Sequence, residues 1–348
     1  MRVVIPVAEQ LDRARQEILV GGPLNGRIGL ILIDNALELM CHQKATEILE
    51  RDRASRRLSP AQRNDARGQV FGRKVAFLKG LGHIADDQVR AITIFHRHRN
   101  QLYHAGLRND PVVDHLARRY FVLTIELMAP LLGVARHLRW EGALLDDTAR
   151  RLLPELAGAS RHRARVDIAD LARRLQADLP EPAQGLQAAL RDHLLARIQR
   201  SEEDFAFIAT GRGGKDDPRD TLRRVQLEHD TLAELVRVRR DQDKERRRLG
   251  LPEKPLDESV LSMARGMPIL VELNGKLLPD WHPKHRGLPF SSWRKQAASI
   301  DRQESLQALD IFDRVLREIE ALDEVMAEPI DDMHGWNQHM EDVMMDRR

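Results

Sequence analysis

Apolar residues recur every three or four positions along much of the chain, which is the spacing of an amphipathic helix. Residues 24–58 form the longest such stretch without a proline, so they predict one long helix that begins near Asn25. The first half of this stretch is apolar on nearly every side. A helix of that kind belongs in the centre of a bundle.

Further helices are predicted on both sides of this stretch. Ser59 and Pro60 are typical of the start of a helix, and Gly106 is typical of a helix end. Residues 1–140 therefore predict an all-α bundle of four or five helices with short connections. The other expected helices cover residues 8–19, 59–80, 85–105 and 109–138.

The pattern is weaker after residue 140. Pro154 and Pro180 break it into short helical segments, and the Asn274–Gly275 pair predicts either a β-hairpin turn or a helix start. We expect residues 141–348 to form a mainly helical region of unknown role that ends in an acidic tail. Longer helices are expected at 181–209, 220–250 and 301–328, with a linker at 210–220.

Composition supports a helical protein in a reducing compartment. Only 4% of the residues are aromatic, which disfavours a β-sandwich or barrel. Cys41 is the single cysteine, so no internal disulfide forms. The longest apolar run, at residues 121–135, is shorter than a membrane span and contains Glu126. No secretory signal begins the chain, so we expect a cytoplasmic protein that does not cross a membrane.

Charge is unevenly distributed. Residues 1–140 hold 22 basic and 14 acidic residues, whereas the remainder holds 34 basic and 40 acidic residues. A basic N-terminal part is compatible with an acidic partner such as RNA, although such asymmetry is common between domains. The sequence Gly213-Gly214-Lys215 does not make a phosphate-binding loop, because it lacks the earlier glycine and the following Ser or Thr.

The stretch FHRHRNQLYHAG at residues 95–106 concentrates polar side chains on a predicted helix. Asn100 and His104 are four residues apart and share a helix face, whereas Arg99 lies about 140° around the helix from His104. Two copies of the helix across a two-fold axis would bring an arginine and a histidine to one cleft. Arginine stabilises phosphate charge, and histidine transfers protons near neutral pH.

Arg99, Asn100 and His104 form an R-N-x-x-x-H motif near the end of the third long helix of the bundle, after IDNALEL on an earlier apolar helix. Over residues 10–135 the chain resembles the HEPN (higher eukaryotes and prokaryotes nucleotide-binding) domain family. The resemblance implies a dimeric bundle with metal-independent endoribonuclease activity, common among toxins and antiviral-defence proteins. It also implies that the histidine acts on the ribose 2′-hydroxyl or the leaving oxygen and leaves a 2′,3′-cyclic phosphate. Arg97 fits the longer spacing that the family allows, so it is a second candidate for the arginine.

Other residues near the motif have candidate supporting roles. Asp34 and Glu38 are four residues apart on an apolar helix, and one of them is expected to orient Arg99 or His104; the alternative is an ion pair within the bundle or across a dimer. Tyr103 is expected to pack beside the motif. Residue 106 is glycine where some family members carry a modifiable tyrosine, so that mode of regulation is in doubt.

His96 and His98 are interpreted as RNA contacts or as solvated residues. Their alternating spacing points the two rings apart on a helix, so no shared metal site is expected. We expect neither a metal nor another cofactor.

Two classes of function follow. The first is a homodimeric enzyme that cleaves RNA and is controlled by its C-terminal region or by a regulatory or antitoxin protein. The second is a catalytically inactive helical module for dimerisation and partner binding. A DNA-binding regulator is a third class, but no helix-turn-helix spacing stands out.

Overall fold

The computed structural model describes most of the chain, and the account below concerns these residues only. The side chains of residues 102–104, 136–139, 157, 163 and 346, which lie in helices or strands, are outside the described set. The described residues are 3–104, 111–139, 147–157, 163–177, 179, 184–210, 217–250 and 280–346.

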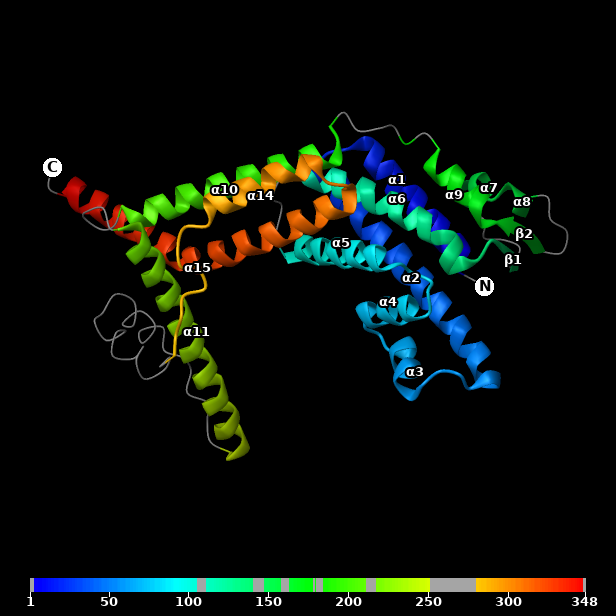
Figure 1. The fold of residues 1–348 in the computed structure, drawn as a ribbon, viewed down its shortest axis with the longest axis horizontal. Coiled ribbons are helices and arrows are strands. Elements are labelled where there is room, and N and C mark those ends of the chain that lie inside the picture. The colour runs from blue at the N-terminus through cyan, green and yellow to red at the C-terminus, as the bar shows by residue number, and fades with distance from the viewer. Residues whose placement is uncertain are drawn as a thin grey trace. The chain divides into compact units, whose positions relative to one another are not determined.

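The chain divides into two compact units (Figure 1). Unit 1 comprises Met1–His193 and Ala298–Asp313, and unit 2 comprises Leu194–Ala297 and Arg314–Arg348. The boundary expected at residue 140 stays a prediction. The described structure is overwhelmingly helical, as the sequence predicts, and none of its helices is both long and apolar enough to cross a membrane.

Unit 1 consists of a helical bundle and a two-stranded sheet, and residues 298–313 from the later part of the chain complete it. The helices and strands are α1 (Val4–Val20), α2 (Pro23–Ser55), α3 (Pro60–Arg67), α4 (Phe71–Gly80), α5 (Asp86–His104), α6 (Val112–Leu132), β1 (Ala135–Arg139), α7 (Asp147–Leu152), α8 (Pro154–Ala157), β2 (Arg163–Asp167), α9 (Ile168–Gln176), the start of α10 (Leu186–Ala209), η2 (Ile300–Arg302) and the start of α15 (Ser305–Asp346).

Helix α2 is the centre of this bundle. It packs extensively against both α1 and α6, and Figure 1 shows all three running together. The buried side chains of its first half, such as Leu30, Ile33, Leu37 and Met40, form one broad face, and the helix also contacts α3, α4 and α5. This confirms the central position that the apolar pattern predicts for this helix.

The start of α2 is held by α6 and lies two residues before Asn25, near which the sequence predicts it. The helix begins at Pro23, and the Gly22 amide donates to Asp114 Oδ2 at 2.8 Å. Asn25 instead donates from its side chain to the Gly21 carbonyl. A Cβ atom on Gly26 would lie 3.1 Å from the backbone nitrogen of Asp114 and would also press on its carboxylate, so glycine favours this close approach of the two helices.

The single helix expected at residues 59–80 is two helices, α3 and α4. Ser59 caps α3 as predicted, and the Gln62 side chain accepts from the Ser59 amide to complete a capping box. The extended backbone of Gly68 ends α3. This break matters for function because it turns α4 toward α2 and places Phe71 and Lys74 beside it.

The helix expected at residues 109–138 ends early, which is a second correction. Gly133 has a φ of 87°, and the chain then enters strand β1. Strand β1 pairs antiparallel with β2, with Ala135 opposite Asp167 and Arg139 opposite Arg163. The apolar spacing in residues 121–132 does not indicate where the helix ends. The sequence therefore did not predict the change from helix to strand.

Unit 2 is built from the remainder of α10, from α11 (Pro218–Arg248), α14 (Phe290–Ser299) and the remainder of α15. Trp293 of α14 is buried and donates from its indole nitrogen to Glu318 of α15 at 2.7 Å. The expected acidic tail is instead part of α15, which continues through Pro329 to Asp346. The predicted turn at Asn274–Gly275 and most of the predicted linker at 210–220 lie outside the described residues, although residues 218–220 begin α11.

Candidate functional site

A group of polar side chains lies where α2 and α5 meet inside unit 1. Asp34 and Glu38 are one turn apart on α2, and His96 and Arg99 are three residues apart on α5, so each pair shares a helix face. We call this group the polar cluster. Its members are Asp34, Asn35 and Glu38 of α2, His96, Arg99 and Asn100 of α5, and Tyr120 of α6.

Asp34 lies at the centre of the polar cluster. Its side chain is fully buried, and three other residues contact its carboxylate. The Tyr120 hydroxyl donates to Oδ1 at 2.7 Å, His96 Nδ1 lies 2.9 Å from Oδ2, and Arg99 Nε lies 3.3 Å from Oδ2. A buried carboxylate is stable only when its charge and hydrogen bonds are satisfied, and these contacts meet that need.

The guanidinium of Arg99 is held on more than one side. Its Nη1 donates to Asn100 Oδ1 at 2.9 Å, and its Nη2 donates to Asn35 Oδ1 at 3.0 Å. Together with Asp34 at Nε, these contacts fix the plane of the group. Asp34 rather than Glu38 contacts Arg99, and this contact fits both the expected orienting role and the alternative of an ion pair within the bundle, so the orienting role stays a prediction.

His96 is paired with Asp34 rather than solvated. The pKa of His96 is raised above its usual 6.5, mainly because Asp34 accepts a hydrogen bond from Nδ1; the negative charges of Asp34 and Glu38 add to this, whereas burial and Arg99 oppose it. The ring packs against Phe71, with centroids 4.9 Å apart. Its side chain is 28% exposed, so the imidazole still reaches solvent.

Glu38 lies at the edge of the polar cluster and is partly exposed. Burial and the negative charge of Asp34 raise the pKa of Glu38, against the opposing effect of His96, Arg99 and Lys74. His96 Nδ1 is 3.8 Å from Glu38 Oε1, which is an ion-pair distance but longer than a hydrogen bond. The carboxyl of Glu38 is therefore protonated more readily than an ordinary glutamate.

Arg97 and His98 lie on the other side of α5 and contact α15. Arg97 forms an ion pair with the buried Asp313, and the His98 ring lies 5.6 Å from the ring of Phe312. His98 is only 8% exposed. The structure thus corrects the interpretation of His98 as an RNA contact or solvated residue, because helix packing covers it. It also places Arg97 away from Asp34 and Arg99.

His104 and Tyr103 occupy the last turn of α5, and their side chains lie outside the described residues. The backbone puts His104 five residues beyond Arg99 on the same helix. The relation of the His104 imidazole to Arg99, within one copy or between two, therefore stays a prediction.

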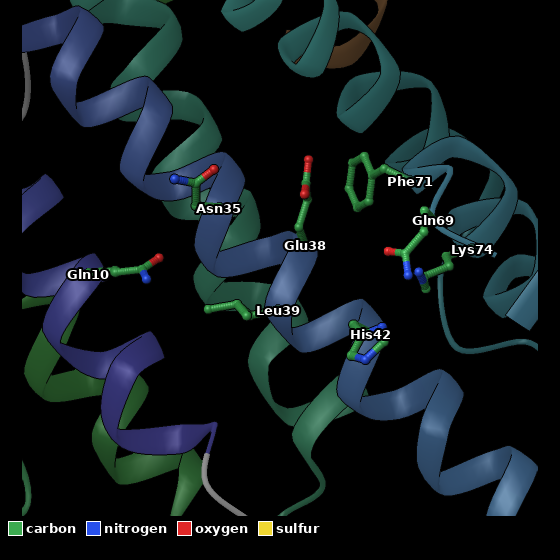
Figure 2. Close-up of a pocket in the computed structure, with 8 residues that line it drawn as sticks. All are labelled: Gln10, Asn35, Glu38, Leu39, His42, Gln69, Phe71 and Lys74. Atoms are coloured by element: carbon green, nitrogen blue, oxygen red, sulfur yellow. The ribbon is translucent and has the colours of Figure 1, made fainter. Parts of the chain in front are cut away.

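A pocket of about 460 Å³ lies beside the polar cluster, over the exposed face of α2. This volume is within the range of about 300–1,000 Å³ that is typical of small-ligand sites. Figure 2 shows Gln10 of α1 on one side and Phe71 and Lys74 of α4 on the other, with Glu38 rising between them. The residues that line this pocket are Gln10, Asn35, Glu38, Leu39, His42, Gln69, Phe71 and Lys74.

Asp34, Glu38 and His96 are also close enough to hold a cation, because one ligand atom of each lies within 4.8 Å of the others. Two features oppose this use. Tyr120 and His96 already hydrogen-bond to the Asp34 oxygens, and the positive charge of Arg99 lies 3.3 Å away. The sequence alone does not indicate this grouping, because Asp34 and His96 are 62 positions apart.

The candidates predicted from the sequence also do not include four residues of the polar cluster and the pocket: Asn35, Tyr120, Phe71 and Lys74. Asn35 follows Asp34 directly, and Tyr120 is one of only two tyrosines and begins the mainly apolar second half of α6. A polar group at the edge of an apolar stretch was therefore the available signal. No family model, curated protein or solved structure matches the chain.

Proposed function

We propose that the chain is a metal-independent endoribonuclease of the HEPN type, in which Arg99 and His104 of two copies form a composite site. The observation that supports this most is the fixed position of the Arg99 guanidinium, which Asp34, Asn35 and Asn100 all contact. A preorganised cation aimed at developing phosphate charge is the largest single contribution in many hydrolytic enzymes.

The charge of the polar cluster also suits an anionic substrate. The raised pKa of His96 favours its cationic form. This shift makes the cluster more positive than its residue types alone would imply. Lys74 adds a further positive charge nearby. Phosphate groups of RNA are attracted to such a site.

The reaction we propose is an internal transesterification. The ribose 2′-oxygen attacks the adjacent phosphorus and loses its proton, while the bond from phosphorus to the 5′-oxygen breaks and that oxygen gains a proton. The products are a 2′,3′-cyclic phosphate and a 5′-hydroxyl end. His104 carries one of these protons, and Arg99 stabilises the charge on the phosphorane oxygens.

The test is cleavage of a mixed single-stranded and hairpin RNA in the presence of EDTA, by the wild type and by His104→Ala. Matched controls are His83→Ala and Arg90→Ala, which remove the same side-chain types from outside the polar cluster. We expect cleavage by the wild type and both controls, 2′,3′-cyclic phosphate ends on the products, and a loss of about a thousandfold for His104→Ala.

Cleavage that persists in His104→Ala would contradict the catalytic assignment. Activity that requires added Mg²⁺ would contradict the metal-independent mechanism. A wild type that dimerises and binds partner protein but leaves every RNA intact would favour the second candidate, a catalytically inactive dimerisation and partner-binding module. The complete burial of Asp34 in a satisfied network is the observation that favours this second candidate.

We further propose that the cleavage serves a cytoplasmic toxin or antiviral-defence effector under the control of a regulatory or antitoxin protein. Expression of the wild type is then expected to arrest growth, and His104→Ala is expected to relieve the arrest. Growth that stops equally with both forms would separate toxicity from RNA cleavage.

A further inference from the structure

The pocket over α2 presents hydrogen-bond acceptors that nothing in the described chain uses. Glu38 accepts no hydrogen bond among the described residues, and its carboxylate rises into the pocket (Figure 2). Gln10 Oε1 is buried and has no hydrogen-bond partner among the described residues. A buried acceptor without a donor costs about 1–3 kcal/mol, so a ligand with N–H groups is the natural partner here.

A cation lies next to these acceptors. Lys74 lines the same pocket and is only 5% exposed. Its ammonium donates one hydrogen bond to the Gly68 carbonyl, and an ammonium has three donors. The positive charge of Lys74 also acts on Glu38, as its effect on the Glu38 pKa shows. The pocket therefore combines a carboxylate that accepts with an ammonium that donates.

The remaining wall of the pocket suits a planar ring. Phe71 and Leu39 give it apolar surface, and the side chains of Asn35 and Gln69 bring amide groups to its rim. Unpaired bases in RNA are recognised in this way, with an aromatic contact to the ring and hydrogen bonds to the base edge.

Hydrogen-bond patterns distinguish the four bases. A carboxylate accepts two hydrogen bonds and donates none, so its best partner is an edge with two adjacent donors. Guanine alone provides this, through N1–H and the N2 amino group, and it carries the acceptors O6 and N7 next to them. In adenine, cytosine and uracil, a hydrogen-bond acceptor lies beside the donor. The lone pair of that acceptor would repel one oxygen of the Glu38 carboxylate.

We propose that this pocket binds one unpaired guanine base, with Glu38 accepting from N1–H and the N2 amino group and Lys74 donating to O6. The base belongs to the RNA substrate, a statement that rests on the proposed ribonuclease function. A free guanine nucleotide has the same edge, so the experiment includes both sources.

The first arm measures binding without cleavage, by calorimetric titration of the full chain with 5′-GMP, 5′-IMP, 5′-AMP, 5′-CMP and 5′-UMP in EDTA at about pH 8. The variant is Glu38→Gln, whose side chain is partly exposed and therefore tolerant of substitution. The matched control is Glu47→Gln, which makes the same change nine residues along α2 and so on the opposite face of that helix.

We expect 5′-GMP to bind about tenfold or more tightly than the other nucleotides, and Glu38→Gln to remove that preference. Inosine lacks the N2 amino group, so 5′-IMP is expected to bind more weakly than 5′-GMP to the wild type but equally to Glu38→Gln. The Glu47→Gln control keeps the wild-type preference. Equal binding of all five nucleotides, or an unchanged preference in Glu38→Gln, would overturn the proposal.

The second arm uses RNA oligonucleotides that are identical except for one guanosine replaced by inosine. Preferential cleavage or binding of the guanosine form places the base in the RNA chain, whereas a preference seen only with mononucleotides assigns the pocket to a free nucleotide. Different results would contradict the guanine pocket and the ribonuclease function. Cleavage that depends on His104 but ignores guanine contradicts the pocket alone, and guanine binding without any cleavage contradicts the ribonuclease alone.

Discussion

The two faces of α5 contain the same kinds of residue and meet different surroundings. His96 and Arg99 contact the buried carboxylate of Asp34 on α2, next to an open pocket. Arg97 and His98 contact Asp313 and Phe312 of α15, where packing covers the histidine. Each face thus pairs an arginine and a histidine with an aspartate, but the histidine is partly exposed on the first face and covered on the second.

The difference teaches that residue type does not identify a catalytic side chain in this helix. Four consecutive polar residues, at positions 96 to 99, divide between the two faces because each step along a helix turns by about 100°. Arg97 and His98 use their polar groups to join helices. Arg99 and His96 also join helices through their polar groups, but the residues that they contact include two that line the pocket, Asn35 and Glu38.

The largest expected effect separates the two arginines by activity. Arg99→Ala is expected to lower RNA cleavage by about 100-fold to 1,000-fold, because it removes the cation that stabilises phosphate charge. Arg97→Ala is expected to leave kcat within about twofold, because Arg97 pairs with Asp313 on the other face. The rate of cleavage under saturating RNA measures both, and equal losses would contradict the comparison.

The two aspartates are expected to differ in stability. Asp34→Ala leaves Arg99 and His96 without their buried counter-charge, so the free energy of unfolding is expected to fall by about 3–5 kcal/mol. Asp313→Ala is expected to cost about 1–3 kcal/mol, because the partly exposed Arg97 is solvated more easily. Urea denaturation followed by circular dichroism measures both values, and a larger loss for Asp313→Ala would reverse our ranking.

A smaller effect concerns the hydrogen bond between Tyr120 and Asp34. Tyr120→Phe is expected to lower the free energy of unfolding by about 1–3 kcal/mol, because one oxygen of a buried carboxylate loses its donor. Thr124→Val, one turn further along α6, is the matched control. Its hydroxyl is buried without a hydrogen-bond partner among the described residues, so its removal is expected to be neutral or stabilising. Equal destabilisation by both changes would argue against a special role for Asp34.

The smallest effect is a pH dependence, and it has opposite signs for two histidines. The raised pKa of His96 means that its pair with Asp34 adds stability below the usual pKa of 6.5, and that this contribution disappears as the pH rises through the raised value. The pKa of His115 is lowered by burial, so its contribution to stability falls as the pH drops through 6.5. Urea denaturation between about pH 5 and pH 9 tests this. Relative to the wild type, His96→Ala should lose more stability at the acid end; a greater loss at the alkaline end would contradict the pairing.

Much of the helical architecture is predictable from the sequence, because apolar spacing and capping residues act locally. The buried first half of α2 and the cap at Ser59 follow directly from the pattern. The break at Gly68 and the strand after Gly133 do not, because both depend on which neighbour the next segment meets. A glycine permits a change of direction without specifying it.

The site was predictable only in part for the same reason. Asp34 beside Arg99 could be anticipated, because a charge on an apolar helix needs a partner. His96 and His98 were equivalent in sequence, and only the positions of α2 and α15 separate them. Gln10 and Lys74 are far apart in sequence, so their shared pocket required the fold.

The measurement that tests the central claim most directly is the activity of a mixed dimer. One protomer carries Arg99→Ala and the other carries His104→Ala, each with a different tag so that the mixed species is purified after co-expression. A composite site needs one arginine and one histidine from different copies, so the mixed dimer retains one intact site of two. We expect about half the wild-type cleavage in EDTA, whereas each variant alone is inactive. A mixed dimer as inactive as its parents would contradict the composite site.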